Sequence, residues 1–419
     1  MSPRPAPAAG PDRPRRAAPL RLVEGGRTRA PTPRPSRPDR VATRTALMAI
    51  VGSLCAVGLV MVLSASAYTS LQLYKSVWTI FERQLLWMGL GVISLLVALR
   101  VPIGFWRRVR VPLLVGTMVL LVAVLVPGIG EVSGGSSRWI GVGLLRIQPS
   151  ELMKLALAVF AADLLTRRAD KLERTGAVVL PLLLVLAVSG LLVLKQPDMG
   201  TAIVLVCITF GLLYAGDVPL RPVLWALAAT TALGLVFALA PSYRRDRLLS
   251  FINPTAHQSN SGYQVFQSLV GLGNGHLFGL GLGAGQQKWG LLPNPHTDFI
   301  FSVIGEETGL VGTLLVISLF FALAWYGIRA AVRSPDRFSC LLAVACVTWI
   351  SAQAVINIGA VIGVLPVTGI PLPFISFGGS SLVITMAAGG ILMNIAGHEQ
   401  VPGVGSVPAR TGPAVHRRR

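Results

Sequence analysis

Charged residues are scarce in this chain of 419 residues. Asp, Glu, Lys and Arg make up 13% of it, while 53% of its residues are hydrophobic and the mean hydropathy is +0.67. A soluble domain cannot bury so much apolar surface, whereas a polytopic helical protein presents it to lipid. The composition therefore excludes an ordinary soluble protein and predicts an all-α polytopic membrane protein.

Acidic residues are scarcer than basic ones, 17 against 37, which gives a net charge of +20. Such a charge can indicate nucleic-acid binding, but its distribution argues against that partner. Residues 1–44 are rich in Arg and Pro, which predicts a disordered cytoplasmic tail attracted to anionic lipid or an acidic partner. Residues 399–419 form a second basic tail, also expected in the cytoplasm.

Residue sets for metal and nucleotide binding are also lacking. The four cysteines lie in or at the ends of apolar runs without metal-ligand spacing, so they are interpreted as packing residues. No Ser-His-Asp set is visible. The Gly-rich stretch 271–290, GLGNGHLFGLGLGAGQQKWG, lacks the GK[ST] of a phosphate-binding loop. We expect instead a re-entrant or surface-lying segment, preceded by a short interfacial helix at GYQVFQSLV (262–270).

Long apolar runs are what the chain has in abundance. About ten are long enough to span a bilayer core, which needs roughly 20 residues. They lie near 45–67, 84–102, 110–129, 150–166, 176–195, 200–217, 221–241, 299–328, 338–365 and 377–397. Lys and Arg cluster at 107–110, 167–174 and 329–337, which places those loops and both tails inside. The predicted transmembrane domain is 45–398, with a large extracytoplasmic loop, 241–298, between the seventh and eighth helices.

Ionisable groups inside these spans cost at least about 2.5–3.5 kcal/mol each, so they need a partner or a cavity. In the stretch 136–154, Ser150 is expected as a helix N-cap, with Glu151 and Lys154 one turn apart and able to pair. Two interpretations stay open: interfacial capping, or a cavity-facing ion pair that meets an anionic ligand beside Arg138. Farther along, Asp198 in KQPDMGTA is expected to cap the next helix.

The stretch LLPNPHTDFIFSVIGEETGLVG (291–312) places Asp298 at the start of an apolar helix, as a cap or as a catalytic carboxylate. Glu306 and Glu307 lie about 12 Å deeper. We expect them to be structural, with one of them paired to Lys154 or to another cation from a neighbouring helix. In 364–381, three prolines followed by GGSS break the helix, which favours the wall of a site. Gln353 and Asn357 can reach the same region.

A base and several cations near a membrane surface suit an alcohol nucleophile and a phosphate leaving group, which makes a lipid pyrophosphate the natural candidate for the substrate. Residues 45–398 then resemble the SEDS family (shape, elongation, division and sporulation) of bacterial cell-wall proteins. The motifs that carry this resemblance are RWIGVGLLRIQPSELMK, KQPDMGTA, SGYQVFQSL, KWGLLPNPHTDFIFSVIGEETGLVG and QAVINIGAVIGVLPVTGIPLPFISFGGSS, in that order. The fourth motif and PLPFISFGGSS look most like the division members, and the tail resembles actinobacterial versions. Phe377 departs from the Tyr usual in the family.

The resemblance implies a peptidoglycan glycosyltransferase that polymerises lipid II at the outer face of the bacterial plasma membrane, at the division septum. It assigns Asp298 as the general base that activates the acceptor hydroxyl. The cations expected to stabilise the departing pyrophosphate are Arg138, Lys154 and Lys288, with Arg244 and Arg245 as weaker candidates. The predicted substrate-binding residues are Arg138, Glu151, Lys154, Lys288, His296, Thr297, Ser376, Gly378 and Ser380.

The implied partners are lipid II, an undecaprenyl-pyrophosphate-linked glycan, a cognate class B penicillin-binding protein and other divisome proteins. A divalent cation, Mg²⁺ or Mn²⁺, is possible, although no ligand set encodes it. Three alternatives stay open: an elongation-type polymerase of the same family, a lipid II flippase, and a scaffold that recruits division proteins through the basic tail.

Overall fold

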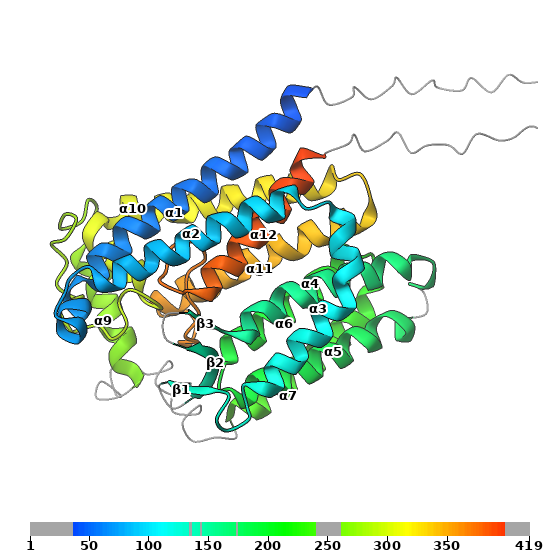
Figure 1. Cartoon of the computed structure of the whole chain (residues 1–419), viewed down its shortest axis with the longest axis horizontal. Coiled ribbons are helices and arrows are strands. Elements are labelled where there is room, and N and C mark those ends of the chain that lie inside the picture. Colours follow the sequence, from blue (N-terminus) through cyan, green and yellow to red (C-terminus); the bar gives the residue numbers. More distant parts are fainter. Residues whose placement is uncertain (1–36, 134–135, 143–144, 173–174, 240–260, 399–419) are drawn as a thin grey trace, which may run out of the picture.

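The computed structural model describes residues 37–133, 136–142, 145–172, 175–239 and 261–398. Within these ranges, each of ten long helices overlaps one of the predicted apolar runs, with bounds that differ by up to eight residues (Figure 1). They are α1 (Arg37–Tyr74), α2 (Thr79–Arg100), α3 (Ile103–Ala123), α4 (Pro149–Arg167), α5 (Thr175–Lys195), α6 (Met199–Ala215), α7 (Leu220–Leu239), α10 (Ile300–Val332), α11 (Arg337–Val361) and α12 (Ser380–Gly397). Helix α1 begins inside the predicted tail. The rest of that tail, the C-terminal tail and Arg244 and Arg245 lie outside the described residues.

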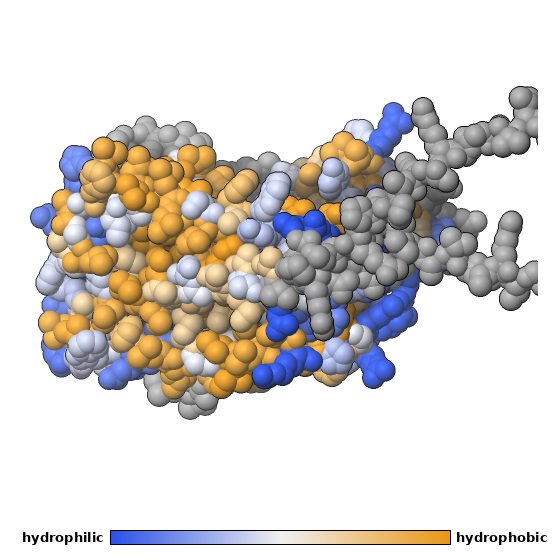
Figure 2. All heavy atoms as spheres, turned by 90° about the horizontal axis from the view of Figure 1, so that it is seen from above, coloured by the Kyte–Doolittle hydropathy of each residue, from blue (hydrophilic) through white to orange (hydrophobic). Residues whose placement is uncertain are grey.

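The long helices identify a multi-pass membrane protein. Among the described residues, α1, α2, α5, α10, α11 and α12 are long and apolar enough to cross a membrane. Two of the other long helices are shorter or more charged: α6 has 17 residues, and α3 has three arginines among its first eight residues. Figure 2 shows hydrophobic side chains over most of one face, with hydrophilic ones gathered toward its ends. That pattern fits a protein whose middle faces lipid.

The two ends of the bundle differ. One, here called the sheet end, holds the small β-sheet, helix α9 (Ser261–Asn274) and the loops before α10 and α12 (Figure 1). The other, the tail end, holds the start of α1 and the end of α12. Helix α9 confirms the short helix expected at 262–270. Most residues of α4, α11 and α12 are buried, and Trp349 and Lys154 on these helices are among the largest fully buried side chains.

A three-stranded antiparallel sheet, which the sequence did not predict, lies between α3 and α4. Its strands are β1 (Glu131–Ser133), β2 (Ser136–Val142) and β3 (Leu145–Ile147), in the order β1-β2-β3. Ile140 of β2 pairs with Ile147 of β3. The strands are too short to give a clear alternation of apolar and polar residues. The sheet is important for the site because β2 positions Arg138 beside the start of α6.

Helix α10 is interrupted at Gly309, where φ is 69° and ψ is −164°. A side chain would be strained in this conformation, and a Cβ would lie 2.4 Å from the amide nitrogen of Gly279. The Gly-rich loop therefore packs backbone against backbone on the break. Amides of Leu280 and Gly281 donate to the carbonyls of Glu306 and Glu307, both at 3.0 Å. In return, the amides of Leu310 and Val311 donate to the loop carbonyls of residues 276 and 277. Close backbone approach thus explains these glycines.

Candidate functional site

Asp298 lies in the loop that leads into α10, at the sheet end. The helix begins at Ile300 and its N-cap residue is Phe299, so Asp298, predicted as a cap or as a catalytic carboxylate, lies one residue before the observed N-cap. The Asn357 amide donates to the carbonyls of Asp298 and Ile370, both at 2.8 Å. It thereby ties the Asp298 loop to the segment between α11 and α12. A Cβ on Gly369 would lie 3.7 Å from Oδ2 of Asp298, so the carboxylate faces that segment closely.

A buried ion pair lies on α4. Nζ of Lys154 is 2.7 Å from Oε2 of Glu151, and both side chains are at most 2% exposed, which confirms the predicted pairing. Nζ also donates to Oε1 of Gln353 at 2.8 Å and lies 5.1 Å from the Trp349 ring centroid. Gln353 in turn donates to the Pro371 carbonyl at 2.9 Å. The ammonium is therefore held inside the bundle and connects α4 through α11 to the segment before α12.

The starts of three helices meet at Asp198. Its carboxylate accepts the Thr201 amide at 3.1 Å, so Asp198 caps α6 as predicted. Oδ2 also accepts from Nε2 of Gln148 at 3.0 Å and from the Ser150 hydroxyl at 3.1 Å. The backbone amide of Gln148 donates to Oγ of Ser380 at 3.1 Å. The expectation that Ser150 is the N-cap of α4 is wrong: Gln148 occupies that position, and the Ser150 hydroxyl is used to join α4 to α6.

Arg138 is half-buried beside the turn that precedes α6. Its Nε donates to the Gln196 carbonyl at 2.8 Å, and Nη2 donates to the Pro197 carbonyl. These two bonds fix the guanidinium, and among the described residues they use only part of its fork of five donors. An arginine held in this way can present the remaining donors to an anion at the sheet end.

His296 and its neighbours form the other wall. The His296 ring packs edge-on against Phe377 with centroids 5.7 Å apart, and the Phe377 amide donates to the His296 carbonyl at 3.0 Å. Burial lowers the pKa of His296 to about 4, so the imidazole is neutral at pH 7. Its Nδ1 is buried without a hydrogen-bond partner among the described residues. Thr297 donates to the Asn294 carbonyl, and Oγ of Ser376 accepts the Leu372 amide.

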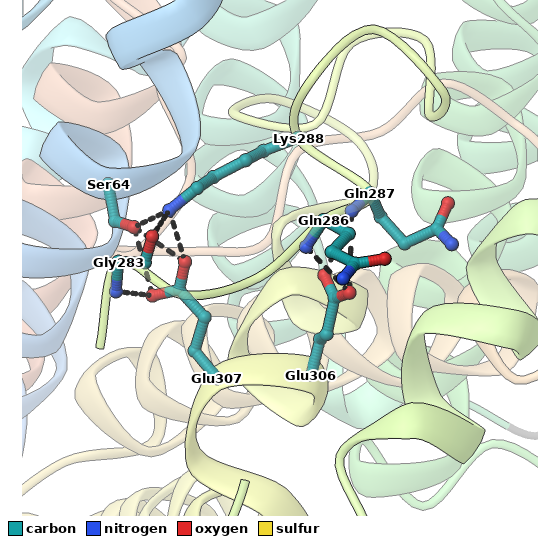
Figure 3. A network of polar contacts seen from close by, with 7 residues as sticks. All are labelled: Ser64, Gly283, Gln286, Gln287, Lys288, Glu306 and Glu307. Carbon is teal, nitrogen blue, oxygen red and sulfur yellow. Dashed lines mark hydrogen bonds and ion pairs between the residues drawn. The ribbon is translucent and has the colours of Figure 1, made fainter. Parts of the chain in front are cut away.

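Glu306 and Glu307 point from α10 into the Gly-rich loop (Figure 3). Glu307 is paired, but with Lys288 of this loop at 2.7 Å and not with Lys154 or a cation from a neighbouring helix. Glu306 makes no ion pair among the described residues and instead accepts the amides of Gln286 at 2.8 Å and Gln287 at 3.2 Å. Sequence spacing could not identify these partners, because Lys288 and Glu307 meet only where α10 breaks.

The sheet end thus gathers one carboxylate in a loop, a half-buried arginine, a neutral imidazole and two buried ion pairs. The sequence analysis named most of these groups. It missed Trp349, Ser64 and the hydrogen-bonding role of Gln148, since nothing in their local sequence distinguishes them from packing residues. Such a set can accept a proton and can stabilise an anion, so it defines a polytopic membrane protein with a polar site at one end of its bundle.

Comparison with known proteins shows which family the chain belongs to. A model of the FtsW/RodA/SpoVE family, described as "Cell cycle protein", matches residues 45–401. Proteins of Mycobacterium bovis and Mycobacterium tuberculosis named "Probable peptidoglycan glycosyltransferase FtsW" are 43% identical over 353 residues, covering 84% of this chain and 67% of theirs. Stage V sporulation protein E of Bacillus subtilis is 40% identical over 352 residues, with 84% and 96% covered. The chain belongs to the FtsW/RodA/SpoVE family, which confirms the predicted SEDS membership.

Solved structures agree with this placement. One, reported under "Structural coordination of polymerization and crosslinking by a peptidoglycan synthase complex", matches with a TM-score of 0.69 at 28% identity, covering 84% of this chain and 96% of that one. The rod shape determining protein RodA of Thermus thermophilus matches with a TM-score of 0.61 at 27% identity, with 84% and 95% covered.

Proposed function

We propose that this protein is a peptidoglycan glycosyltransferase of the FtsW kind, which polymerises lipid II at the extracytoplasmic face of the membrane. Family membership and the names of the mycobacterial relatives support the reaction. The observation that best supports an active site at the sheet end is the position of Asp298. Its loop is fastened through Asn357 to the segment before α12, so that its carboxylate stands among the polar groups of the sheet end.

In the proposed reaction, Asp298 is the general base. The sugar hydroxyl of lipid II attacks the anomeric carbon of the lipid-pyrophosphate-linked glycan while its proton passes to the Asp298 carboxylate. The bond from this carbon to the pyrophosphate oxygen breaks, its electron pair leaves with the pyrophosphate, and the configuration inverts. General-base catalysis of this kind contributes about 10²–10⁴-fold.

The remaining predicted residues form the walls of the proposed substrate site. Arg138 is the group best placed to bind the developing pyrophosphate charge, since its guanidinium is fixed and has donors that no described residue takes up. Because His296 is neutral, it is suited to a hydrogen bond with sugar rather than to charge pairing. The other proposed wall residues are Glu151, Lys154, Thr297, Ser376, Gly378 and Ser380. Lys288, also predicted to bind substrate, instead lies in a buried ion pair with Glu307.

A divalent ion at this site would take part of its ligands from the substrate. Within the described ranges, no group of three or more His, Cys, Asp or Glu side chains is arranged to hold a metal ion. Mg²⁺ or Mn²⁺ would have to be held between Asp298 and the substrate's pyrophosphate. In that position the ion would add positive charge to the leaving group.

We further propose that both tails are cytoplasmic and that the sheet end is extracytoplasmic, as the distribution of Lys and Arg predicts. Three arginines at the tail end fit this orientation: Arg107, Arg110 and Arg167 all bind the buried carboxylate of Asp163, at 2.6–2.8 Å. The proposed partner is a class B penicillin-binding protein that cross-links the product, with other divisome proteins at the septum. The solved peptidoglycan synthase complex supports a partner of this class.

The test is reconstitution with the class B partner in proteoliposomes, using labelled lipid II and resolving glycans on a gel. Moenomycin silences contaminating classical polymerases. Wild type is expected to make polymer and Asp298→Asn none. A flippase would move lipid II in both proteins, and a scaffold would recruit its partners in both. If neither folded, partner-bound protein makes polymer, the proposed function is wrong.

A further inference from the structure

The ion pair between Lys288 and Glu307 closes a segment of the chain around Asp298. The two residues are 19 positions apart, and Asp298 lies close to midway between them. Lys288 ends the Gly-rich loop, while Glu307 lies on the first part of α10, ahead of the break at Gly309. Both flanks of the proposed base are therefore fixed by one buried contact.

This contact belongs to a larger group, here called the glutamate clamp: Ser64, Gly283, Lys288, Glu306 and Glu307 (Figure 3). The Ser64 hydroxyl of α1 lies 2.7 Å from Oε1 and 2.9 Å from Oε2 of Glu307, and the Gly283 amide donates to Oε2 at 3.0 Å. The Tyr68 ring, one turn along α1, lies 5.6 Å from the ring of Trp289. The clamp thus joins the loop to α1 as well as to α10.

All three N–H donors of the Lys288 ammonium are used within the protein. It carries three N–H groups, and its nitrogen has three acceptors: Glu307 at 2.7 Å, the Gly283 carbonyl at 2.8 Å and the Ser64 hydroxyl at 2.9 Å. The side chain is only 5% exposed. A phosphate oxygen would have to displace one of these partners, so the geometry favours a role inside the protein.

The first part of α10 needs such support because the helix is not continuous. At Gly309 the normal i to i−4 hydrogen bonding stops, and residues Ile300–Thr308 are connected to the rest of α10 through a glycine with positive φ. The loop supplies the missing bonds, and its position is set by the two carboxylates. If the clamp is released, both the loop and this short helix can shift, and Asp298 moves with them.

We propose that Lys288, Glu306 and Glu307 are positioning residues for the glycosyltransferase reaction: the glutamate clamp holds the Gly-rich loop in the break of α10 and so fixes the Asp298 carboxylate relative to the substrate. This inference rests on the proposed function and deepens it. It replaces direct contact between Lys288 and the pyrophosphate with an action through Asp298. The clamp determines the rate of the chemical step and leaves substrate affinity largely unchanged.

The test compares Lys288→Met, Glu307→Gln and the double variant, each as the full chain in complex with its partner. The single variants leave one buried charge unpaired, whereas the double variant leaves none. Each single substitution is expected to lower kcat by about 10²-fold through misplacement of Asp298, with KM within about twofold of wild type. The double variant is expected to recover about tenfold of that loss. Hydrogen exchange of the amides at 280–288 should rise in both single variants.

Matched controls are Lys75→Met and Glu82→Gln, two exposed side chains at the same end of the bundle that should change none of these readouts. If Lys288→Met fails to fold, Ser64→Ala removes one clamp partner but keeps the ion pair. It should lower kcat several-fold at constant KM and raise exchange at 280–288. A raised KM with unchanged kcat in Lys288→Met or Ser64→Ala, or a double variant no better than Lys288→Met, would overturn the proposal in favour of substrate contact. If wild type makes no polymer, the proposed function fails, and unchanged exchange in the single variants would independently refute the clamp.

Discussion

Substitution of Lys154 by Met should lower the free energy of unfolding much more than the small change in side-chain volume suggests. The change leaves the Glu151 carboxylate only 2% exposed and without its cation. Removal of one partner from a buried ion pair costs about 3–5 kcal/mol. The contacts of the ammonium with Gln353 and the Trp349 ring are lost as well, and they are part of the same total. The double variant Glu151→Gln with Lys154→Met removes both charges and should cost only about 1–2 kcal/mol.

These free energies can be measured by reversible unfolding in mixed micelles of increasing sodium dodecyl sulfate, followed by tryptophan fluorescence. The control is Lys195→Met, an exposed lysine at the end of α5, which should stay within about 0.5 kcal/mol of wild type. A double variant as unstable as Lys154→Met alone would refute the account, because it would mean that the two charges do not compensate each other in the folded protein.

Two further predictions concern the backbone at Gly309 and the protonation of His296. Gly309→Ala should sharply reduce the yield of folded protein on size-exclusion chromatography, because its Cβ would meet the Gly279 backbone, whereas Gly52→Ala, which meets nothing within 4 Å, should not; equal yields would show that the break tolerates a side chain. With a His296 pKa of about 4, the unfolded chain binds the extra proton between about pH 4 and 6.5. Stability should therefore fall by about 1.4 kcal/mol per pH unit as the pH drops through that window. This part of the slope should be absent in His296→Gln, and an identical slope would contradict the buried, neutral imidazole.

The sequence was sufficient to predict the helices because a membrane forces each spanning segment to satisfy its own backbone hydrogen bonds within a long apolar run. Local chemistry also predicted two side-chain contacts correctly. Asp198 caps α6, and Glu151 pairs with Lys154, because both contacts lie within one helical turn.

Contacts between distant segments were beyond the reach of the sequence pattern. The Glu307 partner is in the Gly-rich loop and meets it only because α10 breaks at Gly309. Ser150 looked like a cap, yet its hydroxyl binds Asp198, 48 residues away. The β-sheet escaped prediction because its strands have three to seven residues, too few for a clear period. These features depend on which helices become neighbours, and no local spacing encodes that.

The central claim is that the Asp298 carboxylate takes the proton from the attacking sugar hydroxyl. The most direct test is the single-turnover rate of glycan formation by the reconstituted complex, wild type against Asp298→Asn, with lipid II binding measured in parallel. The account predicts a rate lower by about 10²–10⁴-fold and binding within about twofold of wild type. A rate within about threefold of wild type, in a folded Asp298→Asn complex that binds lipid II normally, would contradict the assignment of Asp298 as the base.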